Sequence, residues 1–484
     1  MNSRLILCFA AGALAFGGCT MEPHYQRPAA PVPAAFSAPP EPAGAPSSRT
    51  GTDSAAADLG WREFFQDERL QQLIDLALKQ NRDLKVAAYN VEALAAQYRI
   101  QRAQLFPNVT GNAGLDKVRY PNSLAYPGFP NPESIYTVTG GVASWEIDFF
   151  GRLRSLKDQA KQQFFSSQEN RRNVQLTLVA QVATEYLTER ALAEEIAVAA
   201  NTLKAQEDSL FLTRRSYEVG TVSEVDFRTA QSQVATAQSD LAGLKRQYAE
   251  TLTALAVLVG GPLPVTTGQP KYLADTGVLT DLPAGLPSDL LDRRPDILQA
   301  EHQLKAYNAN IGAARAAFFP RITLTASGGT ESLKLSDLFQ PGSATWTIEP
   351  QAILPIFDAG TNLANLKLAK VEKLSAVAQY EKAVQSAFKQ VSDGLTARSL
   401  YEDQVAAQRS LVEADQIVYQ LAEARYRHGI ESYLVELDAQ RSFYAAQQTL
   451  IQTRLARLTN LVTLYQNLGG GWTEHTPSPH GSQP

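Results

Sequence analysis

Residues 315–327 read RAAFFPRITLTAS, and within them a helical pattern gives way to a strand pattern with no loop between the two. After Pro320, the apolar Ile322, Leu324 and Ala326 alternate with polar residues, as in a strand that has one apolar face. Before Pro320 the chain has helical spacing and no breaker. An ordinary helix bundle does not need such a join, so the stretch favours long helices that continue directly into amphipathic strands.

This join belongs to an internal duplication. The segment Tyr217-Glu-Val-Gly220-Thr-Val-Ser223 recurs 209 residues later as Tyr426-Arg-His-Gly429-Ile-Glu-Ser432, and Phe106-Pro107 recurs 213 residues later as Phe319-Pro320. Offsets that agree this closely over most of the chain are hard to obtain by chance. We therefore expect two structural repeats, at 61–276 and 277–472. A disordered tail is expected at 473–484.

Each repeat is expected to contain helices and two strands in the same order, so the fold class is mainly α with a small β part. The expected helices are about 70–106, 152–218 and 223–260, then 297–319, 361–427 and 432–468. The expected strands are about 108–118 and 136–149, with a bulge or kink at Gly140-Gly141, then 321–331 and 344–356. Residues 152–217 contain neither Pro nor Gly. At ~1.5 Å per residue this helix is roughly 100 Å long and needs coiled-coil partners.

Composition excludes several classes of protein. The 44 Lys and Arg against 49 Asp and Glu give a net charge of −5, which argues against a nucleic-acid partner. Cys8 and Cys19 are the only cysteines, and their position in the first 20 residues excludes a disulfide framework and a cysteine-ligated metal. The five His lack ligand spacing, and the sequence has no nucleotide-binding or hydrolase motif. We expect no enzyme, no metal site and no cofactor.

The N-terminus has the pattern of an export signal. Arg4 precedes an apolar run at 5–18, which has the length of a signal-peptide core and is too short to span a bilayer as a helix. We therefore expect residues 1–18 to be a signal peptide. No other stretch reaches 18 continuous apolar residues, so no transmembrane helix is expected in the mature chain.

Small residues directly before Cys19 resemble a bacterial lipobox, in which the Cys is acylated after cleavage. Phe16 stands where Leu is usual, so an ordinary signal peptide with an incidental Cys is the alternative. Residues 21–58 contain eight Pro, which prevents a helix or a packed core and favours an extended tether. We expect 19–60 to be a lipidated tether, and Thr20 after the Cys points to the outer membrane.

The strands imply an oligomer. Four strands cannot close a membrane barrel, because the smallest such barrels have about eight strands. An open sheet edge in lipid leaves backbone groups unpaired, each at a cost of several kcal/mol. Two copies of this chain would supply eight strands and three would supply 12. We expect a barrel shared between copies, with polar faces lining water and the long helices prolonging it as a tube.

Six motifs then point to a known family. They are WEIDFFG at 145–151, RPDI at 294–297, NIGAARAAFFP at 310–320, LPIFDAG at 354–360, YLVELDAQR at 433–441 and LGGGW at 468–472. With them the chain resembles TolC-type outer-membrane efflux channels, in particular the OprM/NodT-like lipoproteins. The resemblance implies a homotrimer in the bacterial outer membrane, with a 12-stranded transmembrane β-barrel and a 12-helix periplasmic α-barrel.

The resemblance also implies partners and a function. It implies a passive exit duct for drugs or other small molecules, gated at its periplasmic tip and anchored in outer-membrane lipid. The duct would dock to a periplasmic adaptor (membrane fusion) protein and an inner-membrane pump of the RND type. An alternative from another class is a periplasmic coiled-coil adaptor or scaffold without a pore. An adaptor would carry one helical hairpin between β-rich domains, whereas this chain has two hairpins within a duplication.

Two turns connect the long helices. Gly220 and Gly429 can adopt positive φ and reverse the chain tightly, and Ser223 and Ser432 suit the N-cap of the returning helix. Simple hairpin turns are one interpretation. The resemblance adds that the turns meet the adaptor, through Val219, Gly220, Thr221, Gly429 and Ser432.

Just beyond the second turn, Leu434, Asp438 and Arg441 are spaced to share one face of a helix. By resemblance, the three copies of Asp438 ring the closed pore mouth, Leu434 forms an apolar constriction and Arg441 ties Asp438 in place. Converging carboxylates attract cations and repel anions. An exposed Asp–Arg pair of little consequence is the alternative. Thr229 stands at the position of Asp438 in the other repeat, so the repeats differ there.

Overall fold

The computed structural model describes residues 20–33, 36, 58–121, 123, 131–264, 272–273, 277–279, 282 and 289–476. The expected signal peptide 1–18, the expected lipidation site Cys19, most of the expected tether and residues 477–484 of the expected tail lie outside this part of the chain. The helices within it are α2 Trp61–Phe64, α3 Glu68–Gln80, α4 Arg82–Ala103, α5 Arg152–Glu218, α6 Glu224–Val259, α7 Asp289–Arg293, α8 Pro295–Ala316, α9 Thr361–Arg427 and α10 Tyr433–Asn467. The strands are β1 Val109–Val118, β2 Glu133–Glu146, β3 Arg321–Ser332 and β4 Ala344–Ile353.

The chain divides into two compact units. The strand unit consists of Met1–Ala29, Asn90–Gln168 and Gln299–Glu381, and the helical unit consists of Ala30–Tyr89, Glu169–Leu298 and Lys382–Pro484. Both units take segments from both halves of the sequence. The compact units therefore cut across the two repeats expected at 61–276 and 277–472.

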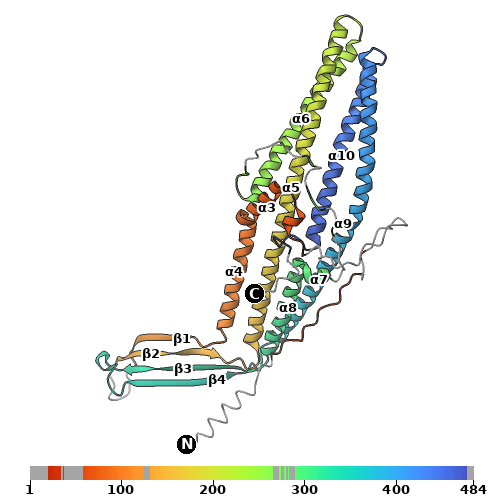
Figure 1. Cartoon of the computed structure of the whole chain (residues 1–484). Helices are drawn as coiled ribbons and strands as arrows, with labels where there is room; N and C mark the ends of the chain where they lie inside the picture. The colour runs from red at the N-terminus through yellow and green to blue at the C-terminus, as the bar shows by residue number, and fades with distance from the viewer. Residues whose placement is uncertain are drawn as a thin grey trace. The chain divides into compact units, whose positions relative to one another are not determined.

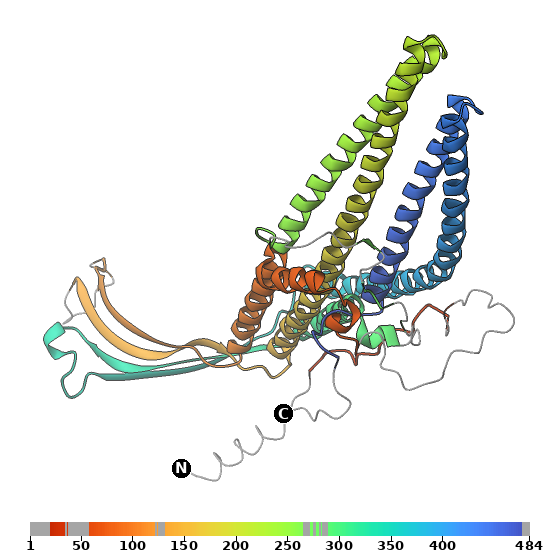
Figure 2. The same ribbon diagram turned by 45° about the horizontal axis from the view of Figure 1, so that its top comes forward.

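The strand unit contains one antiparallel sheet in the order β1-β2-β3-β4 (Figure 1). Its central pair, β2 with β3, joins the two halves of the sequence and places Gly140 opposite Gly328. β1 and β4 are the edges, and the sheet is curved along its strands (Figure 2). The strands lie within a few residues of the positions that the alternating pattern indicates.

β2 is irregular at a different place from the one predicted. Gly140-Gly141 is paired in register with both neighbouring strands, whereas the register shifts just after Val142, where Ser144 has a φ of 52°. A Cβ on Gly141 would lie 2.3 Å from the backbone oxygen of Ala326. This glycine therefore allows β2 and β3 to approach closely, and the bulge does not depend on it.

The helix predicted at about 70–106 is two helices. Asn81 separates α3 from α4 with an extended ψ of 135°. Its Oδ1 accepts a hydrogen bond from the Leu84 backbone N–H at 2.9 Å, and its Nδ2 donates to the Leu258 carbonyl oxygen at 2.9 Å. Asn is favoured at helix N-termini because its side chain satisfies a free backbone N–H. The break therefore follows from the capping bond and from attachment to α6.

In the helical unit, α5 runs beside α6 and α9 runs beside α10 (Figures 1 and 2). An aromatic cluster packs α2 against α10, where the rings of Phe64 and Tyr465 stack with centroids 4.0 Å apart. The Tyr465 hydroxyl donates to the Leu59 carbonyl oxygen at 2.6 Å. Burial of these large rings is a main source of stability for such a unit.

The first residues of the expected tail are held by α2. The carbonyl oxygens of Thr473 and Glu474 accept hydrogen bonds from the backbone N–H groups of Trp61 and Arg62, at 3.1 and 3.3 Å. These donors belong to the first turn of α2, where N–H groups have no partner within the helix. Residues 473–476 thus have a defined place, unlike the disorder expected for 473–484.

A buried charged network fastens α3, α5 and α6 together. Asp67 caps α3 by accepting from the N–H groups of its first turn, and it accepts from the Tyr186 hydroxyl at 3.0 Å. Glu189 pairs with Arg69 at 3.3 Å and accepts from the Tyr248 hydroxyl at 2.9 Å. A buried carboxylate is tolerated when hydrogen bonds and counter-charges satisfy it, as here.

None of the helices in the described part of the chain combines the length and the hydropathy that a membrane span requires.

Candidate functional site

The two turns predicted between the long helices have the same geometry. Gly220 and Gly429 have φ values of 79° and 71°. The N–H of Thr221 donates to the Ser216 carbonyl oxygen at 2.9 Å, and the N–H of Ile430 donates to the Arg425 carbonyl oxygen at 2.9 Å. This six-to-one bond, together with a bond from the glycine N–H, defines a Schellman motif. Glycine is favoured because L side chains rarely adopt this conformation.

The caps that follow the turns differ. The Ser223 side chain accepts from the Asp226 N–H at 3.2 Å, and the Asp226 side chain accepts from the Ser223 N–H, which completes a capping box. Ser432 also occupies the N-cap, but its side chain makes no capping bond. The Val435 N–H donates instead to the Ser432 backbone oxygen at 3.2 Å. The predicted N-cap positions are correct, but only the first serine caps through its side chain.

The turns are open to solvent in the single chain. Val219 is 74% exposed, and nothing lies within 4 Å of a Cβ built on either Gly220 or Gly429. Ile430 is also exposed. Each turn therefore presents an apolar side chain beside an uncovered glycine.

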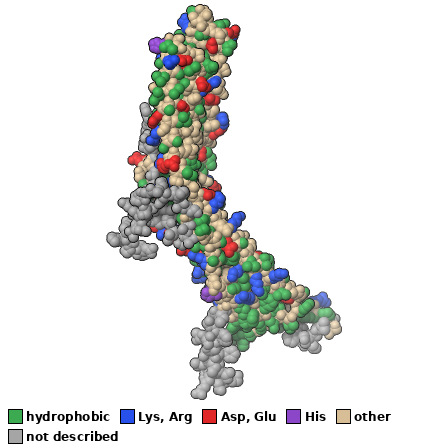
Figure 3. Space-filling model, turned by 90° about the vertical axis from the view of Figure 1, so that its right-hand side faces the viewer, with side chains coloured by type: hydrophobic (Ala, Val, Ile, Leu, Met, Phe, Trp, Pro, Cys, Tyr) green, Lys and Arg blue, Asp and Glu red, His purple; other side chains and the backbone are tan. Residues whose placement is uncertain are grey.

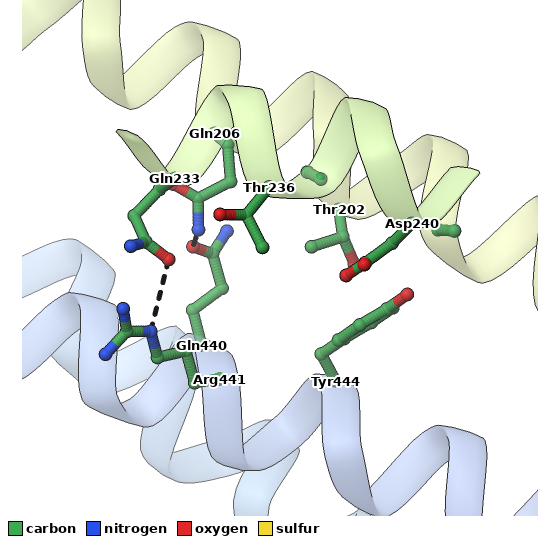
Figure 4. A pocket seen from close by; sticks show the side chains of 10 residues that line it. Thr202, Gln206, Gln233, Thr236, Asp240, Gln440, Arg441 and Tyr444 are labelled. Atoms are coloured by element: carbon green, nitrogen blue, oxygen red, sulfur yellow. Dashed lines mark hydrogen bonds between the residues drawn. The ribbon is translucent and has the colours of Figure 1, made fainter. Parts of the chain in front are cut away.

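The residues predicted for the gate lie on the exposed side of α10. Leu434 is 66% exposed, and Asp438 and Arg441 are exposed as well. Arg441 Nε donates to Gln233 Oε1 on α6 at 3.2 Å (Figure 4). Within one chain, the observed partner of Arg441 is thus Gln233. A tie between Arg441 and Asp438 stays a prediction for the assembled protein.

A polar cavity of about 210 Å³ lies beside Arg441, between the α5–α6 hairpin and α10. Its lining includes Gln206, Gln233, Asp240, Gln440, Arg441 and Tyr444 (Figure 4). Gln206 Nε2 donates to Gln440 Oε1 across the cavity wall. A polar cavity of this size has room for several waters, whose share of liquid volume is about 30 Å³ each.

The cavity is part of a polar seam, which we define as four side-chain pairs that join α5 to the α9–α10 hairpin. The pairs are Thr213–Tyr426, Ser209–Glu436, Gln206–Gln440 and Glu195–Gln452. Sequence reasoning missed this seam. Its signal is the presence of polar residues at positions where a helix seam is ordinarily apolar.

A second site holds the segment that follows Cys19. Residues 20–27, the N-terminal strap, lie along α8 in the strand unit. The Met21 carbonyl oxygen accepts from Arg315 at 3.1 Å, and the Pro23 carbonyl oxygen accepts from Asn308 Nδ2 at 2.7 Å. Further along, Arg27 forms two bonds to Glu301, at 2.8 and 3.2 Å.

The three α8 residues are spaced by seven, so they share one face of the helix. The strap runs antiparallel to α8, with Met21 beside the end that leads into β3. Asn308 is fully buried, and a Cβ on Gly312 would lie 2.9 Å from the Glu22 nitrogen. Burial alone would raise the pKa of Glu301, but hydrogen bonds from Arg27 and Lys305 hold that pKa below its ordinary value. The strap is therefore bound at a formed site.

Comparisons with known proteins agree with these features. The family model described as "Outer membrane efflux protein" matches residues 73–261 and 286–470. The toluene efflux pump outer membrane protein TtgC of Pseudomonas putida is 48% identical over 474 residues, which is 98% of this chain and 97% of that protein. Outer membrane protein OprJ of Pseudomonas aeruginosa is 40% identical over 467 residues, with 96% of this chain and 95% of that protein covered.

A solved structure extends the similarity to the fold. The open state of the MtrE outer membrane channel of Neisseria gonorrhoeae superimposes with a TM-score of 0.85 at 39% identity, covering 95% of this chain and 100% of that one. The predicted fold class and the resemblance to TolC-type efflux channels are confirmed. The chain belongs to the outer membrane efflux protein family, and it functions as the outer-membrane component of an efflux system.

Proposed function

We propose that three copies of this chain form a passive duct through which an efflux pump releases small molecules across the outer membrane. The observation that carries the proposal is the four-stranded sheet, whose edge strands β1 and β4 have no further strand beside them among the described residues. Unpaired edge groups cost several kcal/mol each in lipid. Three copies supply 12 strands, so that β4 of each copy pairs with β1 of the next and the wall closes.

The surface of the sheet fits a position between lipid and water. Figure 3 shows hydrophobic side chains gathered over part of the sheet. On β4, Trp346 is 76% exposed and Ile348 is also exposed. Thr345 and Thr347 alternate with them on the opposite face. An apolar face toward lipid and a polar face toward a channel explain why both faces lack a cover in one chain.

In this assembly, the hairpins α5–α6 and α9–α10 of each copy form the periplasmic continuation of the duct. Their exposed turns, with Val219, Gly220, Thr221, Gly429 and Ser432, are the surface for the hairpins of a periplasmic adaptor. The relative TtgC, which is named as the outer membrane protein of a toluene efflux pump, supports this partnership. The energy for transport comes from an inner-membrane pump of the RND type, and this chain performs no catalytic step.

The duct is gated near the turns. Three copies of Asp438 converge at the pore mouth, with Leu434 as the apolar constriction. The exposure of both side chains on α10 in the single chain supports this arrangement. Carboxylates that converge attract cations and repel anions. Arg441 holds this face of α10 to α6 through Gln233.

The strap supports a lipid anchor at Cys19. Met21 lies at Arg315, six positions before β3 begins at Arg321. An acyl chain on a residue two positions before Met21 would therefore enter the membrane beside the strands. Binding of the strap to α8 holds Met21 at the end of the helix that leads into β3.

The copy number tests this proposal directly. The full-length mature protein is purified in nanodiscs and its mass is measured by native mass spectrometry. We expect three chains per particle, together with covalent lipid. Particles of one or two chains would overturn the trimeric duct, and an open monomer would favour the alternative of a scaffold without a pore.

A further inference from the structure

One buried carboxylate of the polar seam has no part in the proposed duct or gate. Glu436 on α10 is 2% exposed, and its Oε1 accepts from the Ser209 hydroxyl on α5 at 3.1 Å. Its Oε2 is buried with no hydrogen-bond partner among the described residues. An ionised carboxylate in this position bears a large desolvation cost that one hydroxyl does not repay.

The neighbouring charges do not neutralise Glu436. On α9 it faces Glu423 and Arg427, but these two form their own ion pair at 2.6 Å. Three phenols also face it, and they carry no charge at neutral pH: Tyr419 and Tyr426 on α9 and Tyr433 on α10. Two further charged groups, Asp226 of α6 and Arg441 of α10, interact with Tyr433.

We propose that Glu436 is a proton-operated lock between α5 and α10, closed when its carboxyl is protonated and loosened when the carboxyl ionises. A neutral carboxyl can both accept from and donate to a hydroxyl such as that of Ser209, so no charge is buried in the closed contact. An ionised carboxylate gains by moving into water, which requires the two helices to separate. The consequence for transport rests on the proposed duct, but the lock itself does not.

Two of the other three pairs of the seam are suited to separation. Gln206 with Gln440 and Thr213 with Tyr426 are neutral polar pairs, whose hydrogen bonds water can replace. The fourth pair, Glu195 with Gln452, contains a second buried carboxylate. The polar cavity of about 210 Å³ adjoins the seam and has room for water molecules that could replace the hydrogen bonds of the neutral pairs. An apolar seam would instead lose its full burial energy on opening.

The direction of the pH effect follows from linkage. Burial raises the pKa of Glu436 above its ordinary value of 4.5 in the closed contact. The closed contact therefore binds a proton more tightly than the separated helices do. The stabilising effect of protonated Glu436 on the closed contact is complete below the ordinary pKa of the carboxyl. This effect is lost as the pH rises through the raised pKa of the closed contact. Acid closes the seam and neutral or alkaline pH loosens it.

Pulsed electron paramagnetic resonance on the assembled protein in nanodiscs tests the lock. Spin labels at Lys204→Cys on α5 and Ser442→Cys on α10, both exposed positions, report the distance across the seam. Labelled chains are diluted with unlabelled chains so that only distances within one subunit are recorded. We expect the distribution to move to longer distances from about pH 4.5 to about pH 8.5 in the otherwise native chain.

Glu436→Gln keeps a neutral side chain at every pH, so its distribution should stay at the acid position of the native chain. Glu413→Gln removes one exposed carboxylate of α9 and should titrate like the native chain. A native distribution that does not change with pH, or a Glu436→Gln variant that titrates normally, would overturn the lock. The native titration decides by itself if Glu436→Gln does not assemble. A trimer with a seam that ignores pH would remove the lock and leave the duct standing.

Discussion

Gly220 and Gly429 hold the same left-handed backbone, with φ values of 79° and 71°, in corresponding turns of the two repeats. Each ends a helix of 67 residues with the same pair of backbone hydrogen bonds. The caps after the turns differ, and so do Thr229 and Asp438 at corresponding positions. The duplication thus keeps the turn geometry and varies the chemistry beside it.

Gly220→Ala should loosen the first turn without disturbing the assembly. No atom lies within 4 Å of the new Cβ, so the cost is conformational, about 1 kcal/mol. Hydrogen exchange of residues 216–226 should become several-fold faster. Gly243→Ala is the matched control, because Gly243 lies inside α6 with equal room for a Cβ. There the same substitution should slow exchange, since Ala is the better helix former. Equal changes in hydrogen exchange for Gly220→Ala and Gly243→Ala would show that the positive φ of Gly220 does not stabilise the turn.

Asp438→Ala should increase leakage through the closed duct, because it removes the converging carboxylates from the pore mouth. Single-channel current and uptake of a large antibiotic by cells should both rise. Thr229→Ala changes the corresponding position of the first repeat and should leave both unchanged. If the two variants conduct alike, Asp438 has no place in the gate.

Much of this architecture could be predicted from the sequence, because Pro and Gly end helices and form turns through local backbone effects. Pro320 marks the passage from helix to strand, and Gly220 and Gly429 mark the turns. The break at Asn81 is not marked by Pro or Gly. It could not be predicted, because a capping Asn resembles any other polar residue in a helical pattern. The pair Gly140-Gly141 predicts a bulge at the wrong place, because Gly141 allows close packing of β2 against β3.

The pairing of residues in the polar seam could not be predicted, because the partners are distant in sequence. Ser209 and Glu436 are 227 residues apart, and periodicity shows only that each lies on a helix. The same limit applies to Arg441, whose bond to Gln233 depends on how two hairpins pack. Local sequence patterns predict the helices and strands. The side-chain pairs between these elements can be identified only when the three-dimensional structure is known.

Glu189→Ala should be among the most destabilising substitutions in the helical unit. The carboxylate is buried, and its loss leaves Arg69, Arg190 and the Tyr248 hydroxyl without their shared partner. Breaking a buried pair from one side costs about 3–5 kcal/mol. Thermal unfolding of the purified protein should show a clearly lower midpoint. Glu250→Ala, which removes an exposed pair with Arg246, should change the midpoint little. Similar shifts for both would refute the importance of the buried network.

Asn308→Ala should release the N-terminal strap. Asn308 is fully buried and donates to both Glu22 and the Pro23 carbonyl oxygen, at 3.2 and 2.7 Å. Hydrogen exchange over residues 20–27 should accelerate at least several-fold. Asn362→Ala removes a bond to Ala317 elsewhere in the strand unit and should not affect the strap. Unchanged protection of the strap in Asn308→Ala would show that α8 does not hold it through this residue.

Sheets of several copies are expected to close one wall around a water-filled passage. Single-channel recording of the purified full-length mature protein in planar lipid bilayers tests most directly whether they do. We expect discrete current steps of uniform size that persist in every active preparation. Bilayers that contain the inserted protein and yet carry no steps at any voltage would contradict this expectation.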